Sequence, residues 1–152
     1  KGYALAPGAL WDHSIAVAIG AQMLAKHTRS ACPETAFTSG LLHDIGKVVL
    51  NVWLENKLEI TLKYALRNDI PFDAAERKVI GFDHQQVGAY LAQKWGLPDV
   101  FVKAMAYHRY LVDPNSFERL GLQTQDIDPL LDRYVEGVAS FKAMLESLEE
   151  AA

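Results

Sequence analysis

Apolar residues recur at helical spacing along most of the chain, and no stretch sustains the period-two alternation of a half-exposed strand. Asn-Gly and Asp-Gly, the common two-residue hairpin turns, are also absent. The pattern therefore predicts an all-α fold. The expected helices span about 8–27, 33–51, 54–68, 73–80, 84–95, 98–110, 115–120 and 129–149.

Helix-start signals support these boundaries. Proline lacks an N–H group that the first helical turn does not need, so a proline can open a helix. Prolines expected at or just before helix starts are Pro33, Pro98, Pro114 and Pro129, the last two preceded by the N-cap candidates Asp113 and Asp128. The pairs Asp73–Glu76 and Asp83–Gln86 have the spacing of capping boxes.

The most informative segment is Gly40-Leu41-Leu42-His43-Asp44-Ile45-Gly46-Lys47-Val48-Val49-Leu50. Wound as one helix, it is apolar nearly all round, which is typical of a buried helix. His43, Asp44 and Lys47 then share one arc of about 100°. An unpaired buried carboxylate is unfavourable, so Asp44 needs a cation or several donors. A bound metal ion would satisfy Asp44 and use His43 at the same time.

The same winding places three further histidines, His13, His84 and His108, on the apolar sides of three other helices. Together with His43, they are expected to face one core. His27 comes about four turns after His13, roughly 20 Å along the same helix, and is interpreted as a helix-end residue outside the site.

Each of these residues also has a structural interpretation. A single histidine on an apolar face is commonly a packed residue bonded to a carbonyl group, and Asp44 could pair with Lys47 at i, i+3. Four independent buried imidazoles would each need a separate partner, whereas a shared cation satisfies them together. We therefore favour a metal site. Lys47 could neutralise phosphate charge there, or extend past the helix end to solvent.

The types of candidate ligand limit which metal ions would bind. Mixed imidazole and carboxylate ligands suit Fe, Mn, Zn or Ni, whereas an all-oxygen set would have suited Mg or Ca. Such an ion lowers the pKa of bound water and can hold a phosphoryl oxygen.

Composition excludes several other classes of protein. The chain has 152 residues, 50% hydrophobic and 22% charged, which predicts one ordinary globular domain over 1–152. A formal net charge of −4 gives no electrostatic footprint for nucleic acid. No apolar run approaches a membrane span and no signal-peptide pattern is present. With Cys32 as the single cysteine, these features predict a cytoplasmic protein. The abrupt start at Lys1 suggests a piece of a longer chain.

The motifs together resemble the HD superfamily of metal-dependent phosphohydrolases, and most closely its HDOD branch, over roughly residues 2–110. The segments that carry the resemblance are Leu10-Trp11-Asp12-His13, Gly40-Leu41-Leu42-His43-Asp44-Ile45-Gly46-Lys47, Phe82-Asp83-His84-Gln85, Trp95-Gly96-Leu97-Pro98 and Tyr107-His108. The resemblance implies an HD-like helical bundle within a longer HDOD region, with 111–152 as a helical extension. It also implies metal ligation by His13, His43 and Asp44. His84 and His108 match positions that extend the site in binuclear relatives such as HD-GYP phosphodiesterases.

Departures from the family pattern bear on catalysis. Binuclear relatives carry paired histidines where this chain has His108-Arg109, and their later ligating aspartate has no obvious equivalent here. Asp113 could substitute, but it has the position of a helix cap. The Gly-Tyr-Pro signature is absent as well, which weighs against cyclic di-nucleotide hydrolysis.

We therefore expect a bacterial signal-transduction module of HDOD type with a divalent-metal site. It would act through a signalling protein partner or a small phosphorylated or nucleotide ligand, and self-association is left open. The alternative is an active phosphohydrolase or phosphodiesterase, in which a metal-bound hydroxide attacks phosphorus and Asp44 and Lys47 are catalytic. A third possibility is a purely structural domain with vestigial histidines, which would carry no metal.

Overall fold

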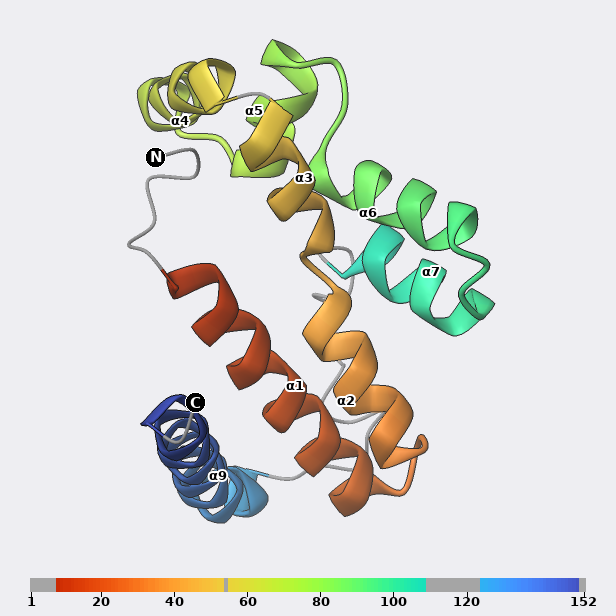
Figure 1. The fold of residues 1–152 in the computed structure, drawn as a ribbon, viewed down its shortest axis with the longest axis vertical. Helices are drawn as coiled ribbons and strands as arrows, with labels where there is room; N and C mark the ends of the chain where they lie inside the picture. The colour runs from red at the N-terminus through yellow and green to blue at the C-terminus, as the bar shows by residue number, and fades with distance from the viewer. Residues whose placement is uncertain (1–7, 54, 109–123, 151–152) are drawn as a thin grey trace.

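The computed structural model describes residues 8–53, 55–108 and 124–150, and every regular element in these ranges is an α-helix, as predicted (Figure 1). The helices are α1 (Ala9–Thr28), α2 (Pro33–Leu42), α3 (Ile45–Trp53), α4 (Glu55–Asn68), α5 (Phe72–Val79), α6 (His84–Lys94), α7 (Asp99–Tyr107) and α9 (Thr124–Glu150). The predicted helix over 115–120 and the Asp113-Pro114 cap lie outside the described residues.

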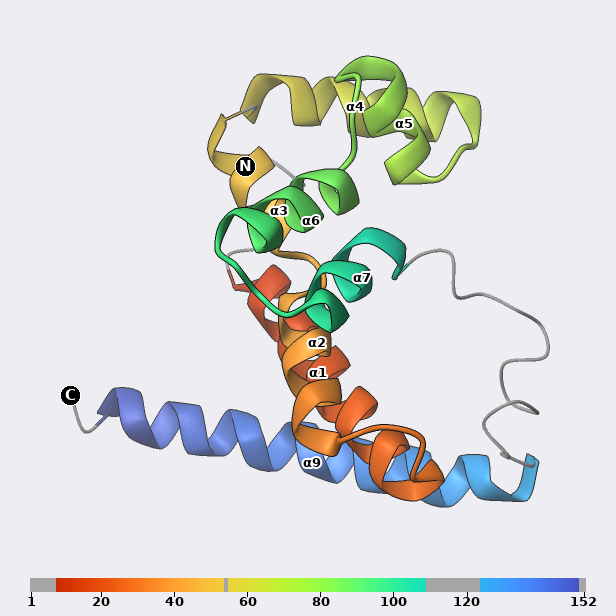
Figure 2. The ribbon, with the colours of Figure 1, turned by 90° about the vertical axis from the view of Figure 1, so that its right-hand side faces the viewer.

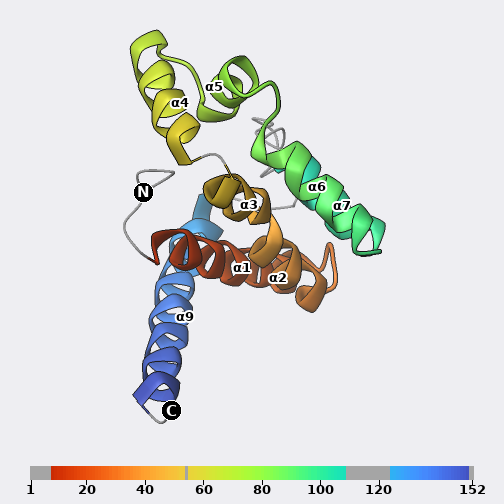
Figure 3. The ribbon, with the colours of Figure 1, turned by 45° about the horizontal axis from the view of Figure 1, so that its top comes forward.

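The helices are arranged largely as pairs. α1 and α2 lie side by side, and α6 and α7 form a second pair that packs on α3 and α2 (Figure 1). α4 and α5 form a third pair beyond the end of α3, while α9 packs across α1 at the opposite end of the molecule (Figure 2). Seen with the top tilted forward, α3 lies between α1 and α6 (Figure 3). The junction of α2 with α3 therefore lies where the first two pairs meet.

The predicted single helix over 33–51 is wrong, because two helices meet there. α2 ends at Leu42 with His43 as its C-cap, and α3 begins at Ile45. The Lys47 N–H donates to Asp44 O at 2.9 Å, a short-range bond that restarts the helix. The close packing of α3 on α6 overrides the local preference of this apolar run for one continuous helix.

The expectation that residues 40–50 are buried all round is also wrong for α3. Leu50 is 2% exposed, but Val48 is 46% exposed. Among the described elements, α6 and α4 pack on α3 and leave this side of it uncovered. The apolar run therefore reflects the density of packing near Asp44 and not burial of the entire helix.

Some of the helix-start signals predicted from the sequence are confirmed and others are wrong. The Asp83–Gln86 capping box is complete, because Gln86 N donates to Asp83 Oδ1 at 2.9 Å and Asp83 N donates to Gln86 Oε1 at 3.1 Å. The Asp73–Glu76 box is wrong, since α5 begins one residue earlier than predicted and both carboxylates bond elsewhere. Pro33 opens α2 as predicted.

The start of the final helix is a further correction. Pro129 lies inside α9, which already includes Thr124, so Asp128-Pro129 is not its cap. A proline there removes one internal hydrogen bond, and the helix continues past it. Across the helices described, none is both long enough and apolar enough to cross a membrane. The assignment of 1–152 to one domain stays a prediction.

We predict that Gly46→Ala strongly destabilises the fold. A Cβ atom at Gly46 would lie 1.9 Å from His84 O and 2.8 Å from Gly88 N, and both of these are backbone atoms that cannot rotate away. Thermal or urea unfolding should show a loss of about 3 kcal/mol. Gly20→Ala is the matched control, because its Cβ meets only the Tyr134 ring, at 3.3 Å, and the change should stay within about 1 kcal/mol. Equal effects would contradict this account of the α3–α6 contact.

Candidate metal centre

Four imidazole rings surround one carboxylate at the junction of α2 and α3. His13 comes from α1, His43 is the C-cap of α2, His84 is the first residue of α6, and His108 is the C-cap of α7. His13 Nε2 and His43 Nε2 lie 3.5 Å and 3.3 Å from Asp44 Oδ2. His108 Nε2 and His84 Nε2 lie 3.4 Å and 3.6 Å from Asp44 Oδ1. The residues predicted to share a site do lie together, while their role as ligands stays a prediction.

The Asp44 carboxylate divides this cluster into two halves. We call His13, His43 and Asp44 the Oδ2 half, and Asp44, His84 and His108 the Oδ1 half. Within each half, the candidate ligand atoms all lie within 4.8 Å of one another, so each half could hold a metal ion. In the Oδ1 half, the two Nε2 atoms are 3.3 Å apart.

Helix-end carbonyls fix the rings of the two C-cap histidines. His43 Nδ1 lies 2.6 Å from Gly40 O, and His108 Nδ1 lies 3.0 Å from Met105 O, three residues back along the chain in both cases. A carbonyl oxygen can only accept a hydrogen bond, so Nδ1 is the protonated nitrogen in both rings. The neutral ring then presents the lone pair of Nε2 toward Asp44, which is the arrangement of metal-ligating histidines.

Glu76 on α5 fixes the ring of His84 in the same way. Its Oε2 lies 2.5 Å from His84 Nδ1 and also accepts from His84 N at 3.2 Å. Glu76 is 0% exposed and His84 is 1% exposed. Glu76 was not predicted as a site residue, because its spacing from Asp73 suggested a capping box. Helical winding of α5 would have revealed it, since Glu76 lies one turn after Phe72 on the apolar side of the helix.

These hydrogen bonds leave lone pairs facing one another. When these rings are neutral, with Nδ1 protonated in His43, His84 and His108, their Nε2 atoms are acceptors that point at the acceptor oxygens of Asp44. Asp44 Oδ1 is buried and has no well-formed hydrogen bond to any described residue. Such a set requires extra protons or a cation. The residues present therefore fit a divalent metal ion, which binds several lone pairs at once.

Lys47 supplies part of the positive charge. Its Nζ lies 2.5 Å from Asp44 Oδ2, so the i, i+3 ion pair does form, in a largely buried setting. Burial alone would raise the pKa of Asp44. Hydrogen bonds that the His108 and His43 rings donate to Asp44 when their Nε2 atoms carry a proton, together with the charge of Lys47, outweigh burial and hold that pKa well below its usual range. Asp44 is therefore ionised at neutral pH, which is the form of a carboxylate that a metal ion binds.

His13 lies at the edge of the cluster. Its side chain is 52% exposed, so the expectation that it faces the core holds only for the ring nitrogen beside Asp44. Partial burial lowers the pKa of His13, opposed by Asp44 and assisted by His43 and Lys47, which favours the neutral ligand form. His27 is exposed in the last turn of α1 and belongs to neither half, as expected.

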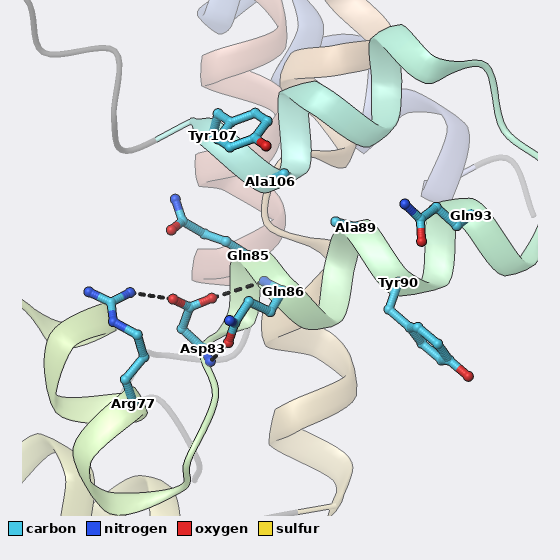
Figure 4. Close-up of a pocket in the computed structure, with 9 residues that line it drawn as sticks. All are labelled: Arg77, Asp83, Gln85, Gln86, Ala89, Tyr90, Gln93, Ala106 and Tyr107. Carbon is cyan, nitrogen blue, oxygen red and sulfur yellow. Dashed lines mark hydrogen bonds and ion pairs between the residues drawn. The ribbon is translucent and has the colours of Figure 1, made fainter.

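A cavity of about 380 Å³ lies next to the cluster, between α5, α6 and α7 (Figure 4). Gln85 lines it, is 2% exposed, and has an Nε2 atom without a hydrogen-bond partner. Arg77 lines another side and bonds to Asp83 and, at 2.9 Å, to Asp73. In Figure 4 the Gln85 amide projects into the space between Arg77 and Tyr107. This cavity was not predicted from the sequence, because its lining residues come from three separate helices.

The fold and the cluster define a protein of the HD phosphohydrolase-like class. More narrowly, the chain belongs to the HDOD domain family, which matches residues 2–111.

Solved structures agree. An HDOD domain protein of unknown function from Geobacter sulfurreducens is 30% identical, with a TM-score of 0.65 over 73% of this chain. A Shewanella amazonensis SB2B protein, whose name proposes a phosphohydrolase, is 25% identical, with a TM-score of 0.63 over 94% of the chain. The MmoQ response regulator of Methylococcus capsulatus str. Bath is 26% identical, with a TM-score of 0.62 over 84%.

The chain spans only part of these relatives. It covers 38%, 50% and 61% of the three solved chains, in the order given above. An uncharacterised protein of Treponema pallidum (strain Nichols) is 28% identical over 142 residues, which are 91% of this chain and 27% of that protein.

We predict that Lys47→Met destabilises the metal-free protein by about 3 kcal/mol, because it leaves the buried Asp44 carboxylate without its ammonium partner. Unfolding is followed in urea with a chelator present. The matched control is Lys63→Met, which breaks an exposed pair with Glu59 on α4 and should leave the free energy of unfolding nearly unchanged. Similar small losses in both variants would show that Lys47 does not stabilise Asp44.

Proposed function

We propose that this chain is an HDOD signal-transduction module that binds a divalent metal at Asp44 and acts through contacts with a ligand or protein partner. The observation that supports the metal is the set of imidazole lone pairs directed at one buried carboxylate, with Nδ1 of three rings already committed to acceptors. Independent structural histidines would need only a partner for Nδ1 and would not place Nε2 beside the same carboxylate.

The candidate ligand atoms also limit which metal ions would bind. Imidazole and carboxylate ligands without a thiolate suit Fe, Mn, Zn or Ni, because hard cations such as Mg and Ca prefer oxygen. Two halves sharing Asp44 are compatible with a binuclear centre. When bound, the metal would supply Lewis acidity toward a phosphoryl oxygen or water. The chain's own residues hold the ring orientations and balance the charge.

The cavity beside the cluster supports action by ligand or partner binding. Gln85 lines it and has an amide nitrogen that is buried without a hydrogen-bond partner, and Tyr90 and Tyr107, which also line it, are 59% and 56% exposed. Its volume is in the range of small-molecule sites. The positive charge of Arg77 is balanced by two carboxylates, so this cavity selects for hydrogen bonding and stacking more than for phosphate. The response regulator among the relatives is consistent with a signalling role.

The proposal predicts that Asp44→Asn abolishes metal binding. Asp44 belongs to both halves and supplies the carboxylate that each shares, and asparagine keeps its size without the charge. Metal content of the purified protein and titration of the chelator-treated protein with Mn, Fe or Zn measure the effect. His27→Ala, which removes an exposed histidine outside the cluster, should bind as the unaltered protein does. If the unaltered protein bound no metal under any of these conditions, the metal site would be excluded and the histidines would have only a structural role.

A second candidate function is metal-dependent phosphodiester hydrolysis. The half-exposed His13 places the Oδ2 half at an accessible edge, and the Lys47 ammonium lies beside it, where it could meet phosphate charge. A relative whose name proposes a phosphohydrolase shares the fold at 25% identity. In this function Asp44 and Lys47 are the residues closest to the substrate.

Generic phosphodiesters distinguish the two candidates. With Mn or Fe added, the signalling module is expected to release no nitrophenol from a nitrophenyl phosphodiester above the background of Asp44→Asn. Turnover that is present in the unaltered protein and abolished by His43→Ala would favour the enzyme. His27→Ala controls for a general loss caused by removing an imidazole.

A further inference from the structure

We propose that the Oδ1 half is the tighter of the two metal subsites, and that Glu76 is the positioning residue that makes it so. This inference rests on the proposed metal site and ranks its two halves. It reverses the order implied by the family resemblance, in which His13, His43 and Asp44 form the primary site and His84 and His108 extend it.

Burial separates the two halves first. In the Oδ1 half, the side chains of His84 and His108 are 1% and 16% exposed. In the Oδ2 half, the side chain of His13 is 52% exposed. A half-exposed ring is less restricted before it binds a metal, so it loses more rotamer freedom on binding. The Oδ1 half is the better preorganised of the two.

The position of Lys47 separates them again. Its ammonium lies 2.5 Å from Asp44 Oδ2, the oxygen that His13 and His43 face. A metal ion in that half must displace this ammonium or bind beside a like charge. Asp44 Oδ1 has no such competitor, because it is buried without a well-formed hydrogen bond to any described residue. The unused acceptor of the carboxylate therefore belongs to the half that contains His84.

Glu76 is a third difference between the Oδ1 half and the Oδ2 half. Its carboxylate lies 2.5 Å from His84 Nδ1 and is 0% exposed, so the pair forms a buried carboxylate–imidazole unit aimed at Asp44 Oδ1. A carboxylate behind a ligating imidazole fixes the ring orientation and raises its basicity, and its loss commonly weakens metal affinity 10- to 100-fold. His43 and His108 have only neutral carbonyls in the equivalent position.

The charges point the same way. Within the described cluster, Lys47 compensates Asp44, so neutral imidazoles alone would leave no net negative charge for a divalent ion. Glu76 adds a carboxylate directly behind His84, in a fully buried environment where a charge acts more strongly than at the surface.

Cobalt(II) titration of the chelator-treated chain tests the ranking, because the visible absorption of the ion reports imidazole coordination independently of any enzymatic activity. We expect Glu76→Gln to weaken the tightest binding step 10- to 100-fold. His84→Ala should do the same or more. His13→Ala should leave that step within about two-fold and remove only weaker binding. Glu59→Gln removes an exposed carboxylate on α4 and is the matched charge control. Far-UV circular dichroism verifies that each variant is folded, and Glu76→Gln keeps the test decisive if His84→Ala does not fold.

The outcomes are distinct. Loss of the tight step in His13→Ala with retention in Glu76→Gln and His84→Ala would overturn the ranking and leave the proposed metal site intact. Equal weakening in His13→Ala and His84→Ala would mean one ion shared by both halves, and would overturn the ranking too. If the unaltered protein takes up no cobalt, the metal site fails and the ranking fails with it.

Discussion

The structure depends on how one carboxylate is buried. Asp44 is 2% exposed at the junction of two helices, where an ionised group is strongly destabilising unless positive charge or donors surround it. Lys47 provides one positive charge and the imidazoles of four segments approach from the other directions. The helices around Asp44 are consequently held together by the need of this buried carboxylate for positive charge and hydrogen-bond donors. Lys47 and the four imidazoles meet that requirement in part, and a bound metal ion would supply the remaining positive charge.

Helix ends do most of this positioning. His43 and His108 each end a helix and bond to a carbonyl three residues earlier, one of the groups that a helix terminus leaves without an internal partner. His84 begins a helix, and Glu76 accepts from both its ring and its backbone N–H. An anion at a helix N-terminus is favoured by the helix dipole. The same unsatisfied backbone groups that every helix must cap are used here to orient the imidazoles.

The sequence predicted the residue types of the site better than its geometry. Periodicity along the chain was sufficient for the all-helical fold, and winding each helix separately grouped His43, His84 and His108. It could not show that His43 and Asp44 lie in a turn, because a helical pattern does not report the tertiary contacts of α3, such as the close fit of Gly46 against the backbone of α6. Glu76 was missed for a related reason. Its partner His84 is eight residues away across a helix boundary, which no helical periodicity connects.

The relation between the cluster and the cavity follows from the same helical geometry. The rings of His84 and His108 face Asp44, Glu76 lies behind His84, and the chain neighbours of these three residues, Arg77, Gln85 and Tyr107, line the cavity. Successive residues of a helix point about 100° apart, so one turn of backbone can serve two sites. A molecule that entered the cavity would therefore contact the same three backbone segments that hold Glu76, His84 and His108 in the cluster. Any displacement of the cavity side chains would be carried to the imidazoles beside Asp44 by the backbone that the two sets of residues share.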